Sequence, residues 1–383
     1  MVDALNFEQG PIRPPSEAGS LLIRVTRNCP WNRCVFCSTY KGKKFSRRGL
    51  DEIKADIDAA KAVFDEIKAI SFTLGEAGKI TPRVLSAVAH DTSLPMAFQS
   101  IGLWAASGGT TVFLQDANSL MLSTEALLDI LGYLRDRFPR VDRITSYARA
   151  ATLQTKTVRD YERLRGAGLS RLHVGMESGS DRILKLIDKG ARSEQLIEGG
   201  RRVVQGGISL CLYVIPGIGG IALSDENAME SARVVNAINP SFMRFRSLFV
   251  RPRTALAEKV KAGEFEPPSE DAMVSEIRKM VNALDGISTS LVSDHILNLL
   301  EEVEGTLPDD KARMLDVIDR YLSLPDEERL LFQLGRRGGG LRSVSDLSHP
   351  VIRSRLEAAK RQIEQELPGG ILEYLEAIKL RFI

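Results

Sequence analysis

The chain has 383 residues, of which 43% are hydrophobic and 27% charged, proportions that are ordinary for a globular protein with a sizeable core. Its formal net charge of +2 gives no support to a nucleic-acid partner, and no apolar run reaches the length of about 18 residues that a transmembrane helix needs. The start of the sequence, Met1–Glu8, lacks the basic residues and apolar core of a signal peptide, so we expect a cytoplasmic protein with no membrane contact.

Three of the four cysteines stand together in one loop near the start. After a lead-in over residues 1–19, the apolar run 21–25 predicts a buried strand, and Cys29, Cys34 and Cys37 follow it directly. Structural zinc sites and ferredoxin clusters usually take four protein ligands. A triad therefore indicates either an iron–sulfur cluster with one iron open to a non-protein ligand or a zinc site completed by a distant histidine.

The middle of the chain alternates between strand and helix patterns. A helix is predicted over 50–70, and residues 71–109, with a second helix at 80–90, form an insertion before the next strand. Further strands are predicted over 110–114, 141–147, 171–176, 208–215 and 241–250, and helices over 124–138, 155–166, 180–188, 193–205, 225–238 and 268–284. With the first strand this makes six strands, each followed by helix, which predicts an α/β fold with a parallel sheet and right-handed crossovers.

Residues 286–383 carry a different pattern. Helical spacing recurs over 288–304, 311–322, 326–334, 351–367 and 371–382. This pattern predicts an all-helical C-terminal extension rather than the two further strand–helix units of a full barrel. The run Gly335–Gly340 holds two arginines among glycines, and it is either a helix end with a hinge or a contact for an anionic group.

Parallel barrels bind their ligands at the carboxyl ends of the strands, so the polar residues and glycines there are candidates for a site. At or after the ends of the second to the fifth strands, the candidate residues and their neighbours are Gln115, Asp116, Ala117, Ser146, Arg149, Glu177, Ser178, Lys189, Ile215 and Gly217. Several have a plain alternative explanation. Asp116 can cap the next helix, Arg149 can be solvated, and Glu177 can belong to a turn of glycines and serines.

Three segments of the sequence resemble motifs of the radical S-adenosylmethionine (SAM) superfamily. Cys34-Val35-Phe36-Cys37 matches the second half of its Cys-x3-Cys-x-aromatic-Cys loop, although four residues instead of three separate Cys29 from Cys34. The segment 115–120, Gln-Asp-Ala-Asn-Ser-Leu, is similar to its Gly-Asp-Ala-x-Ser-Leu motif, and Gly175–Asp181 is similar to its Gly-x-Glu-Ser-Gly-Ser-Asp motif. The resemblance covers residues 20–260 and looks closest to the elongator-like and coproporphyrinogen-oxidase-like branch.

This resemblance implies a partial (β/α)6 barrel of the TIM type over residues 20–285. It also implies that the three loop cysteines hold a [4Fe–4S] cluster and that SAM binds the open iron. Residues at and after the strand ends would then hold SAM. Asp116, next to Gln115 and Ala117, would bind its ammonium group, Ser146 and Arg149 would meet its carboxylate or ribose, and Lys189 would meet its carboxylate. Glu177, next to Ser178, would bind its ribose hydroxyls, and the backbone from Ile215 to Gly217 would pass beside its adenine.

The implied activity is reductive cleavage of SAM at the cluster, which gives a 5′-deoxyadenosyl radical that removes a hydrogen atom from a small-molecule substrate. A flavodoxin or ferredoxin is the electron donor that the resemblance implies. Two other classes stay open. One is a carrier on the same fold, similar to a haem chaperone, that binds SAM or another cofactor without turning it over. The other is a zinc-bound structural protein.

Basic residues allow the substrate to be anionic. Five positive charges lie within 41–48, and Arg251 and Arg253 follow the sixth strand at the expected mouth of the barrel. Asp294, His295 and Asn298 would face one site if their segment is helical. Solvated cations, a helix cap and a solvated histidine are the alternative explanations for these groups.

Overall fold

The computed structural model describes residues 5–382, so the first four residues of the expected lead-in and the last residue of the chain lie outside the described part. One sheet contains eight strands. Their order is β1 (Leu21–Arg24), β4 (Thr111–Gln115), β5 (Arg143–Arg149), β6 (Leu169–Glu177), β7 (Ser209–Val214), β8 (Phe242–Phe245), β9 (Ser290–Val292) and β10 (Gly305–Thr306). The pairs β1–β4, β4–β5, β7–β8 and β8–β9 run parallel, and the pair β9–β10 at one edge runs antiparallel. The predicted α/β fold with a mostly parallel sheet is confirmed.

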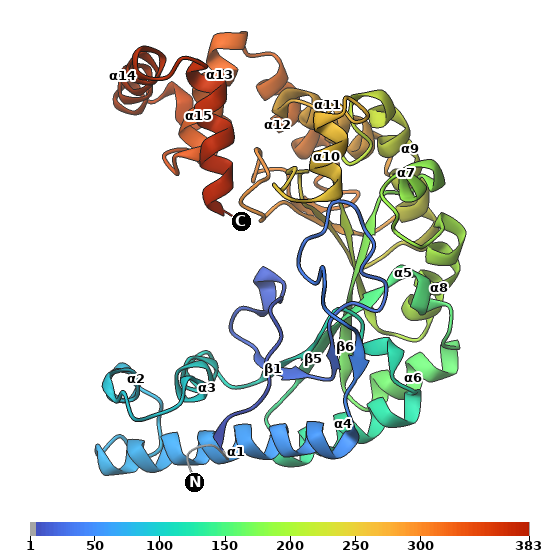
Figure 1. Cartoon of the computed structure of the whole chain (residues 1–383), viewed down its shortest axis with the longest axis vertical. Helices are drawn as coiled ribbons and strands as arrows, with labels where there is room; N and C mark the ends of the chain where they lie inside the picture. The colour runs from blue at the N-terminus through green and yellow to red at the C-terminus, as the bar shows by residue number, and fades with distance from the viewer. Residues whose placement is uncertain (1–4, 383) are drawn as a thin grey trace. The chain divides into compact units, whose positions relative to one another are not determined.

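Helices connect most of these strands (Figure 1). They are α1 (Leu50–Thr73), α2 (Pro82–His90), α3 (Met96–Ala106), α4 (Thr124–Arg137), α5 (Ala150–Leu153), α6 (Val158–Gly166), α7 (Asp181–Leu186), α8 (Ser193–Gln205), α9 (Ser224–Ile238), α10 (Ala255–Lys261), α11 (Glu270–Ala283), α12 (Lys311–Leu322), α13 (Asp326–Arg337), α14 (Pro350–Glu366) and α15 (Gly370–Lys379). Each of the six predicted strands is followed by helix, as the alternating pattern indicated. Within residues 5–382, every helix falls short of the combination of length and hydrophobicity that a membrane-spanning helix requires.

The chain forms two compact units. Within the described residues, the first unit holds the chain up to residue 32 together with 39–174 and 198–210, and the second holds 33–38, 175–197 and the chain from 211 onward. The boundaries fall inside β6, α8 and β7 and on both sides of the segment 33–38.

In the first unit, α1 packs one apolar face against α2, α3 and α4, which lie beside it in Figure 1. Ile53, Ile57 and Ile67 recur on this face at helical spacing and are fully buried. The stretch between α1 and β4 contains α2 and α3. Thr81 caps α2, because its side chain accepts a hydrogen bond from the backbone N–H of Val84.

A buried carboxylate ties the segment before β1 to the sheet of the first unit. Glu17 is fully buried, and Arg143 of β5 donates to its two oxygens at 2.7 and 3.1 Å. Ser20 donates to it at 2.7 Å, and the Nε2 atom of His173 lies 3.6 Å from Oε1. Burial alone would raise the pKa of Glu17, but the hydrogen bonds from His173, Ser20 and Arg143 outweigh it and lower the pKa to about 2.

In the second unit, residues 288–304 depart from the prediction. Ser290–Val292 forms β9 beside β8, and no helix spans the stretch. Leu297, Leu299 and Leu300, whose spacing mimics a helix, are buried from an irregular loop instead. The edge of β8 offers unpaired backbone groups, and the run Thr289–Val292 has the residue types that pair with such an edge. The predicted helix is therefore wrong, and the extension is not all-helical.

The Gly-Arg run is also more ordered at its start than predicted. α13 continues through Arg337, and both Arg336 and Arg337 are buried. Arg337 pairs with Glu270 of α11 at 2.7 Å. A Cβ atom at Gly335 would lie 2.5 Å from the side chain of Leu341, so this position inside the helix has no room for a side chain. The helix therefore extends past its predicted end at residue 334, and Gly335 allows close packing instead of ending the helix.

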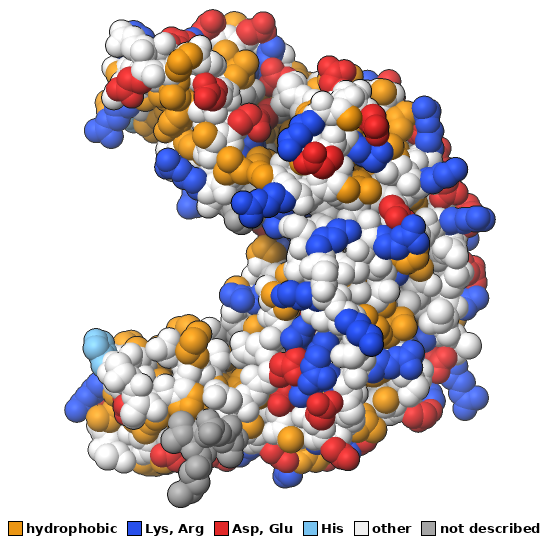
Figure 2. Space-filling model, viewed as in Figure 1, with side chains coloured by type: hydrophobic (Ala, Val, Ile, Leu, Met, Phe, Trp, Pro, Cys, Tyr) orange, Lys and Arg blue, Asp and Glu red, His pale blue; other side chains and the backbone are white. Residues whose placement is uncertain are grey.

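Helices α13, α14 and α15 share an apolar cluster of their own. Leu334, Ile363, Ile371 and Leu375 form its buried part. Figure 2 shows further hydrophobic side chains gathered over this part of the chain. These three helices therefore stabilise one another within the second unit through packing of apolar faces.

The lowered pKa of Glu17 predicts acid sensitivity of the fold. A group with a lowered pKa stabilises the folded chain fully above its unfolded value of 4.5, and the stabilisation is lost as the pH falls toward about 2. We expect Glu17→Gln to lower the free energy of unfolding at pH 7 by about 3 kcal/mol and to flatten its pH dependence below about pH 5. Urea unfolding at a series of pH values measures both effects. Glu66→Gln, on the exposed face of α1, is the control and should change neither, whereas a wild-type pH slope in Glu17→Gln would refute the assignment.

Candidate functional site

The cysteine loop is closed at its base by a short antiparallel ribbon. β2 (Thr26–Arg27) pairs with β3 (Ser46–Arg47), so residues 28–45 form one excursion from the sheet. The three cysteines in it are half-buried and form no disulfide, whereas Cys211 is buried in β7. Cys29 belongs to the first unit, and Cys34 and Cys37 belong to the second.

In the first unit, the additional residue in the gap after Cys29 supports a turn. Asn32 adopts a left-handed backbone conformation, with a φ of 51°, and its N–H donates to the Sγ atom of Cys29 at 3.4 Å. Its side-chain amide donates to the carbonyl oxygens of Tyr40 at 2.5 Å and Lys43 at 3.3 Å. The longer gap is therefore accommodated by an asparagine that fastens the loop to the chain after the last cysteine.

The basic stretch 41–48 is partly structural. Arg48 is buried and pairs with Asp56 of α1 at 2.5 Å. The ammonium group of Lys41 donates to the backbone oxygen of Asn32 at 2.9 Å. Two of the five basic residues thus hold the chain in place, so fewer of them remain as candidates to contact an anionic ligand.

In the second unit, Cys34 and Cys37 stand on a short apolar support. Val35 and Phe36 pack against the buried cluster of Ile183, Ile187, Ile215 and Ile218. The N–H of Val35 donates to the oxygen of Ile187 at 3.0 Å, and its own oxygen accepts from Leu256 at 3.0 Å. The aromatic residue of the motif therefore anchors this half of the loop beside the segments that follow β6 and β7.

The donor set fits an iron–sulfur cluster in its chemistry. The three loop thiols form no disulfide, and they are partly exposed, so they are open to a cofactor. The guanidinium group of Arg251 lies near Cys37 in the second unit and interacts with it electrostatically, which places a cation beside one thiol. In the described part of the chain, no three His, Cys, Asp or Glu side chains stand together as a ready-made metal site. The fit therefore rests on the type, number and exposure of the donors.

Gln115 and Asp116 at the end of β4 make internal contacts in the first unit. The Gln115 amide accepts from the N–H of Gly10 at 2.8 Å and donates to the oxygen of Ile12 at 2.8 Å, so it holds the lead-in segment. The Asp116 carboxylate has no exposed surface and accepts from Arg24, the backbone N–H of Asn28 and the Tyr40 hydroxyl. Of Gln115–Leu120, only Ala117 is partly exposed.

The two candidates on β5 differ in their surroundings. Ser146 is buried, and its hydroxyl group bonds to the oxygen of Leu114 at 2.9 Å and to the hydroxyl of Ser119 at 2.6 Å. Arg149 is partly exposed, and its guanidinium group lies over the Trp31 ring at 5.3 Å. Arg149 thus packs on the residue after Pro30 and keeps a partly exposed side chain, whereas Ser146 joins β4 to β5.

The end of β6 carries a buried ion pair in the second unit. Glu177 has a left-handed φ of 66°, and its Oε1 atom lies 2.5 Å from the ammonium group of Lys189. A Cβ atom at Gly175 would lie 2.1 Å from this oxygen and 2.9 Å from the Lys189 ammonium, so only glycine lets the two charges meet here. Ser178 is buried and accepts from the N–H of Ser180 at 3.1 Å. Two of the predicted residues, Glu177 and Lys189, are therefore brought into contact.

Sequence reasoning missed two residues that hold the segment after β7. Glu276 of α11 accepts hydrogen bonds from the N–H of Gly217 at 2.9 Å and from the side chain of Asn227 at 2.6 Å. Asn227 of α9 also donates to the oxygen of Ile215 at 3.2 Å. Burial raises the pKa of Glu276. The available signal was a carboxylate on the apolar face of an amphipathic helix, which is unusual unless it has partners.

Two arginines and a histidine meet near the ends of β8 and β9 in the second unit. Burial and the neighbouring charge of Arg246 lower the pKa of Arg251. Burial, followed by Arg246 and Arg251, lowers the pKa of His295 to about 4. Among the described residues, no carboxylate forms an ion pair with either arginine. Arg253 is exposed with a φ of 62°, the backbone region that favours glycine.

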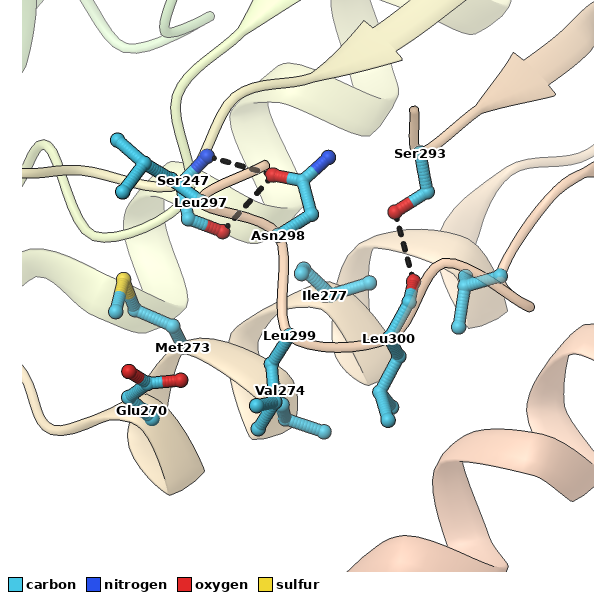
Figure 3. A pocket seen from close by; sticks show the side chains of 11 residues that line it. Ser247, Glu270, Met273, Val274, Ile277, Ser293, Leu297, Asn298, Leu299 and Leu300 are labelled. Carbon is cyan, nitrogen blue, oxygen red and sulfur yellow. Dashed lines mark hydrogen bonds between the residues drawn. The ribbon is translucent and has the colours of Figure 1, made fainter. Parts of the chain in front are cut away.

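Asp294, His295 and Asn298 do not share one face, because their segment is not a helix. Asp294 points to Arg244 and pairs with it at 2.6 Å. Asn298 is buried and accepts from the N–H and hydroxyl of Ser247 at 2.9 and 3.1 Å, beside a small cavity of about 10 Å³ (Figure 3). Asn298 therefore supports the turn after β8, and only His295 of the three lies near the two unpaired arginines.

The comparison with known families gives one match. Residues 99–232 match the model of the radical SAM superfamily. No curated protein matches the chain.

Several solved structures are similar in fold at low identity. Elp3 of the archaeon Methanocaldococcus infernus shares 15% identity over 48% of this chain and 47% of that chain, with a TM-score of 0.38. The methyltransferase TsrM from Kitasatospora setae, with cobalamin and a [4Fe–4S] cluster bound, shares 15% over 64% and 37%, with a TM-score of 0.43. Methylornithine synthase (PylB) shares 13% over 86% and 84%, with a TM-score of 0.38. The chain spans about half the length of the first of these proteins and less of the second.

The family match runs through β4, β5, β6 and β7 and contains the strand-end residues Asp116, Glu177 and Gly217. The cysteine loop precedes it and carries the motif that resembles the same superfamily. Residues 99–232 therefore form a segment that matches the radical SAM superfamily.

Proposed function

We propose that this protein is an enzyme that cleaves SAM reductively and uses the resulting radical to remove a hydrogen atom from a small anionic molecule. The observation that carries the proposal is the loop of three cysteines, none in a disulfide, that precedes the matched segment in the chain. Cys29, Cys34 and Cys37 would hold a [4Fe–4S] cluster, which supplies the electron for cleavage of the S–C5′ bond of SAM when it is bound. A flavodoxin or ferredoxin in the same compartment, the cytoplasm, is the donor class that we propose.

The chain's own contribution at the loop is to orient the thiols. The N–H of Asn32 already donates to the Sγ atom of Cys29, and such hydrogen bonds to ligand sulfur tune a cluster's reduction potential. The cation of Arg251 beside Cys37 favours the negative charge that a thiolate ligand set carries.

We assign the binding of SAM to three groups of residues at or after the ends of β5, β6 and β7. Lys189 engages Oε1 of Glu177, and we assign Oε2 to the ribose hydroxyls. Arg149 suits the carboxylate of SAM because its guanidinium is planar and partly exposed. We assign the adenine to the segment from Ile215 to Gly217 because of the resemblance; this segment is buried, and Glu276 and Asn227 fix its backbone.

The substrate is assigned an anionic group on the basis of Arg246, Arg251 and His295. Two cations near each other repel, and partial burial adds a desolvation cost, so an anion bound between them would be favoured. His295 is neutral at pH 7 because its pKa is about 4. Its Nδ1 atom accepts from the N–H of Leu297 at 3.2 Å, which leaves the proton on Nε2 as a donor for the same anion.

The first test concerns the cluster. Cys34→Ala removes one of three ligands, so we expect protein reconstituted without oxygen to lose most of its iron, its sulfide and its formation of 5′-deoxyadenosine from SAM. Cys211→Ala, in the core of β7, is the control and should retain all three. Full cluster absorbance in Cys34→Ala would contradict the proposal, and a loaded wild-type protein that forms no 5′-deoxyadenosine with reductant would favour a carrier.

The second test concerns the Glu177–Lys189 pair. In Gly175→Ala the new Cβ atom would lie 2.1 Å from Oε1 of Glu177, so the carboxylate must move. We expect the Kd for SAM to rise at least tenfold, which corresponds to about 1.4 kcal/mol, less than one charge-assisted hydrogen bond is worth. Equilibrium dialysis of the reconstituted protein measures this. Gly132→Ala, on the exposed face of α4 with open space at its Cβ, should leave the Kd unchanged, and wild-type affinity in Gly175→Ala would exclude Glu177 as a ligand.

The third test concerns the anion. Inorganic pyrophosphate at constant ionic strength should raise the Tm of the wild-type protein, because it neutralises Arg246 and Arg251. The double variant Arg246→Gln/Arg251→Gln should lose most of this increase. Arg159→Gln, an exposed arginine on α6, should retain it. An equal increase in all three proteins would show that pyrophosphate acts elsewhere and would refute the anion assignment.

A further inference from the structure

Both ends of the cysteine loop meet at one buried carboxylate in the first unit. The Oδ2 atom of Asp116 accepts from the backbone N–H of Asn28 at 3.2 Å, and Asn28 is the residue directly before Cys29. The Oδ1 atom accepts from the hydroxyl of Tyr40, three residues after Cys37. One side chain therefore fastens the chain on either side of the three thiols.

Arg24 completes this arrangement. Its guanidinium donates to Oδ2 of Asp116 at 2.7 Å and to the side-chain oxygen of Asn28 at 3.3 Å. Asn28 has a left-handed φ of 66°, a conformation that asparagine tolerates better than most residues, and its amide donates to the oxygen of Lys44 at 2.7 Å. The turn into Cys29 is thus held by contacts on both sides of the loop.

The Asp116 carboxylate has no room for a further partner. Its side chain has 0% of its surface exposed. A Cβ atom on Gly10 would lie 3.2 Å from it, so the lead-in segment closes over it. Burial and the nearby carboxylate raise the pKa of Tyr40, so the phenol keeps its proton and stays a donor to Asp116. Each oxygen is already paired with a donor from the chain.

We propose that Asp116 is a positioning residue that fixes both ends of the cluster loop, and that it does not bind the ammonium group of SAM. This inference rests on the proposed function, since it concerns how the thiols of that function are held. It assigns Tyr40 the same task, because the two residues act through one hydrogen bond. Among Gln115–Leu120, contact with SAM would then fall to the backbone of Ala117, the one residue of the six that is partly exposed.

Two variants test this inference: Asp116→Asn, which keeps the size but removes the charge, and Tyr40→Phe, which removes one hydroxyl. We expect both to lower the iron and sulfide content per chain at least twofold and to broaden the electron paramagnetic resonance signal of the reduced cluster. The Kd for SAM, measured per loaded cluster, should stay within about twofold of wild type, because SAM does not contact either side chain. The double variant should lose little more than Asp116→Asn alone, since the two share one interaction.

A matched control is available in the same unit. Tyr133 of α4 also donates its hydroxyl to a carboxylate, Asp58 of α1, at 2.7 Å, but on an exposed surface. Tyr133→Phe and Asp58→Asn should leave loading, signal shape and SAM affinity unchanged. Normal loading in Asp116→Asn with a Kd for SAM at least tenfold higher, and normal behaviour of Tyr40→Phe, would make Asp116 the ammonium ligand and overturn the inference. Normal loading and normal affinity in both variants would overturn it as well.

A readout without cofactor separates this inference from the proposed function. In the cluster-free protein, Asp116→Asn and Tyr40→Phe should speed the alkylation of Cys29 by a maleimide several-fold, as followed by peptide mass spectrometry, while Cys211 reacts as in wild type. Faster alkylation in variants of a protein that takes up no iron would keep the positioning task and reject the cluster. Unchanged alkylation of Cys29 in both variants would reject the positioning task, whatever the wild-type protein binds.

Discussion

A carboxylate without exposed surface must find its hydrogen-bond donors inside the protein, and at the end of β4 this requirement shapes the loop that carries the thiols. Asp116 draws Arg24 from β1, and Arg24 in turn pairs with Glu8 of the lead-in at 2.8 Å. Glu8 also accepts from Arg27 at 2.6 Å. The network continues from the strand end through the ribbon at the base of the loop to the N-terminal segment, so these parts of the first unit are fixed together.

Much of the fold could be predicted because its pattern is local. Strand and helix periods alternate, and six strands appear where the apolar runs fall. The failures have tertiary causes. Residues 288–304 have the apolar spacing of a helix, but the free edge of β8 pairs with Ser290–Val292, and a single sequence does not reveal which edge is free. The glycines from Gly335 onward indicate a helix end, whereas the tight packing of Gly335 depends on Leu341, a residue outside the helix.

The candidate site was predictable by residue type and position, but not by contact. The cysteine triad and Glu177 stand out in the sequence because their spacing and their place after a strand are unusual. Two partners of Asp116, Arg24 and Tyr40, lie 92 and 76 residues away in the chain, so no local sequence pattern predicts these contacts. Glu276 was missed for the same reason, since its partners Gly217 and Asn227 come from other elements.

Two acidic residues of similar appearance thus receive different tasks, and the number of donors around each decides which. Asp116 has Arg24, the N–H of Asn28 and Tyr40, and it has no exposed surface, so a ligand could reach it only by breaking these contacts. Glu177 has Lys189 on one oxygen and keeps a partly exposed side chain. A bound hydroxyl group can therefore join Glu177 at little cost, whereas displacing a donor from Asp116 would leave Arg24 with a buried charge that has lost a partner. Incomplete pairing of its oxygens is therefore the reason why we propose Glu177, and not Asp116, as a ligand of SAM.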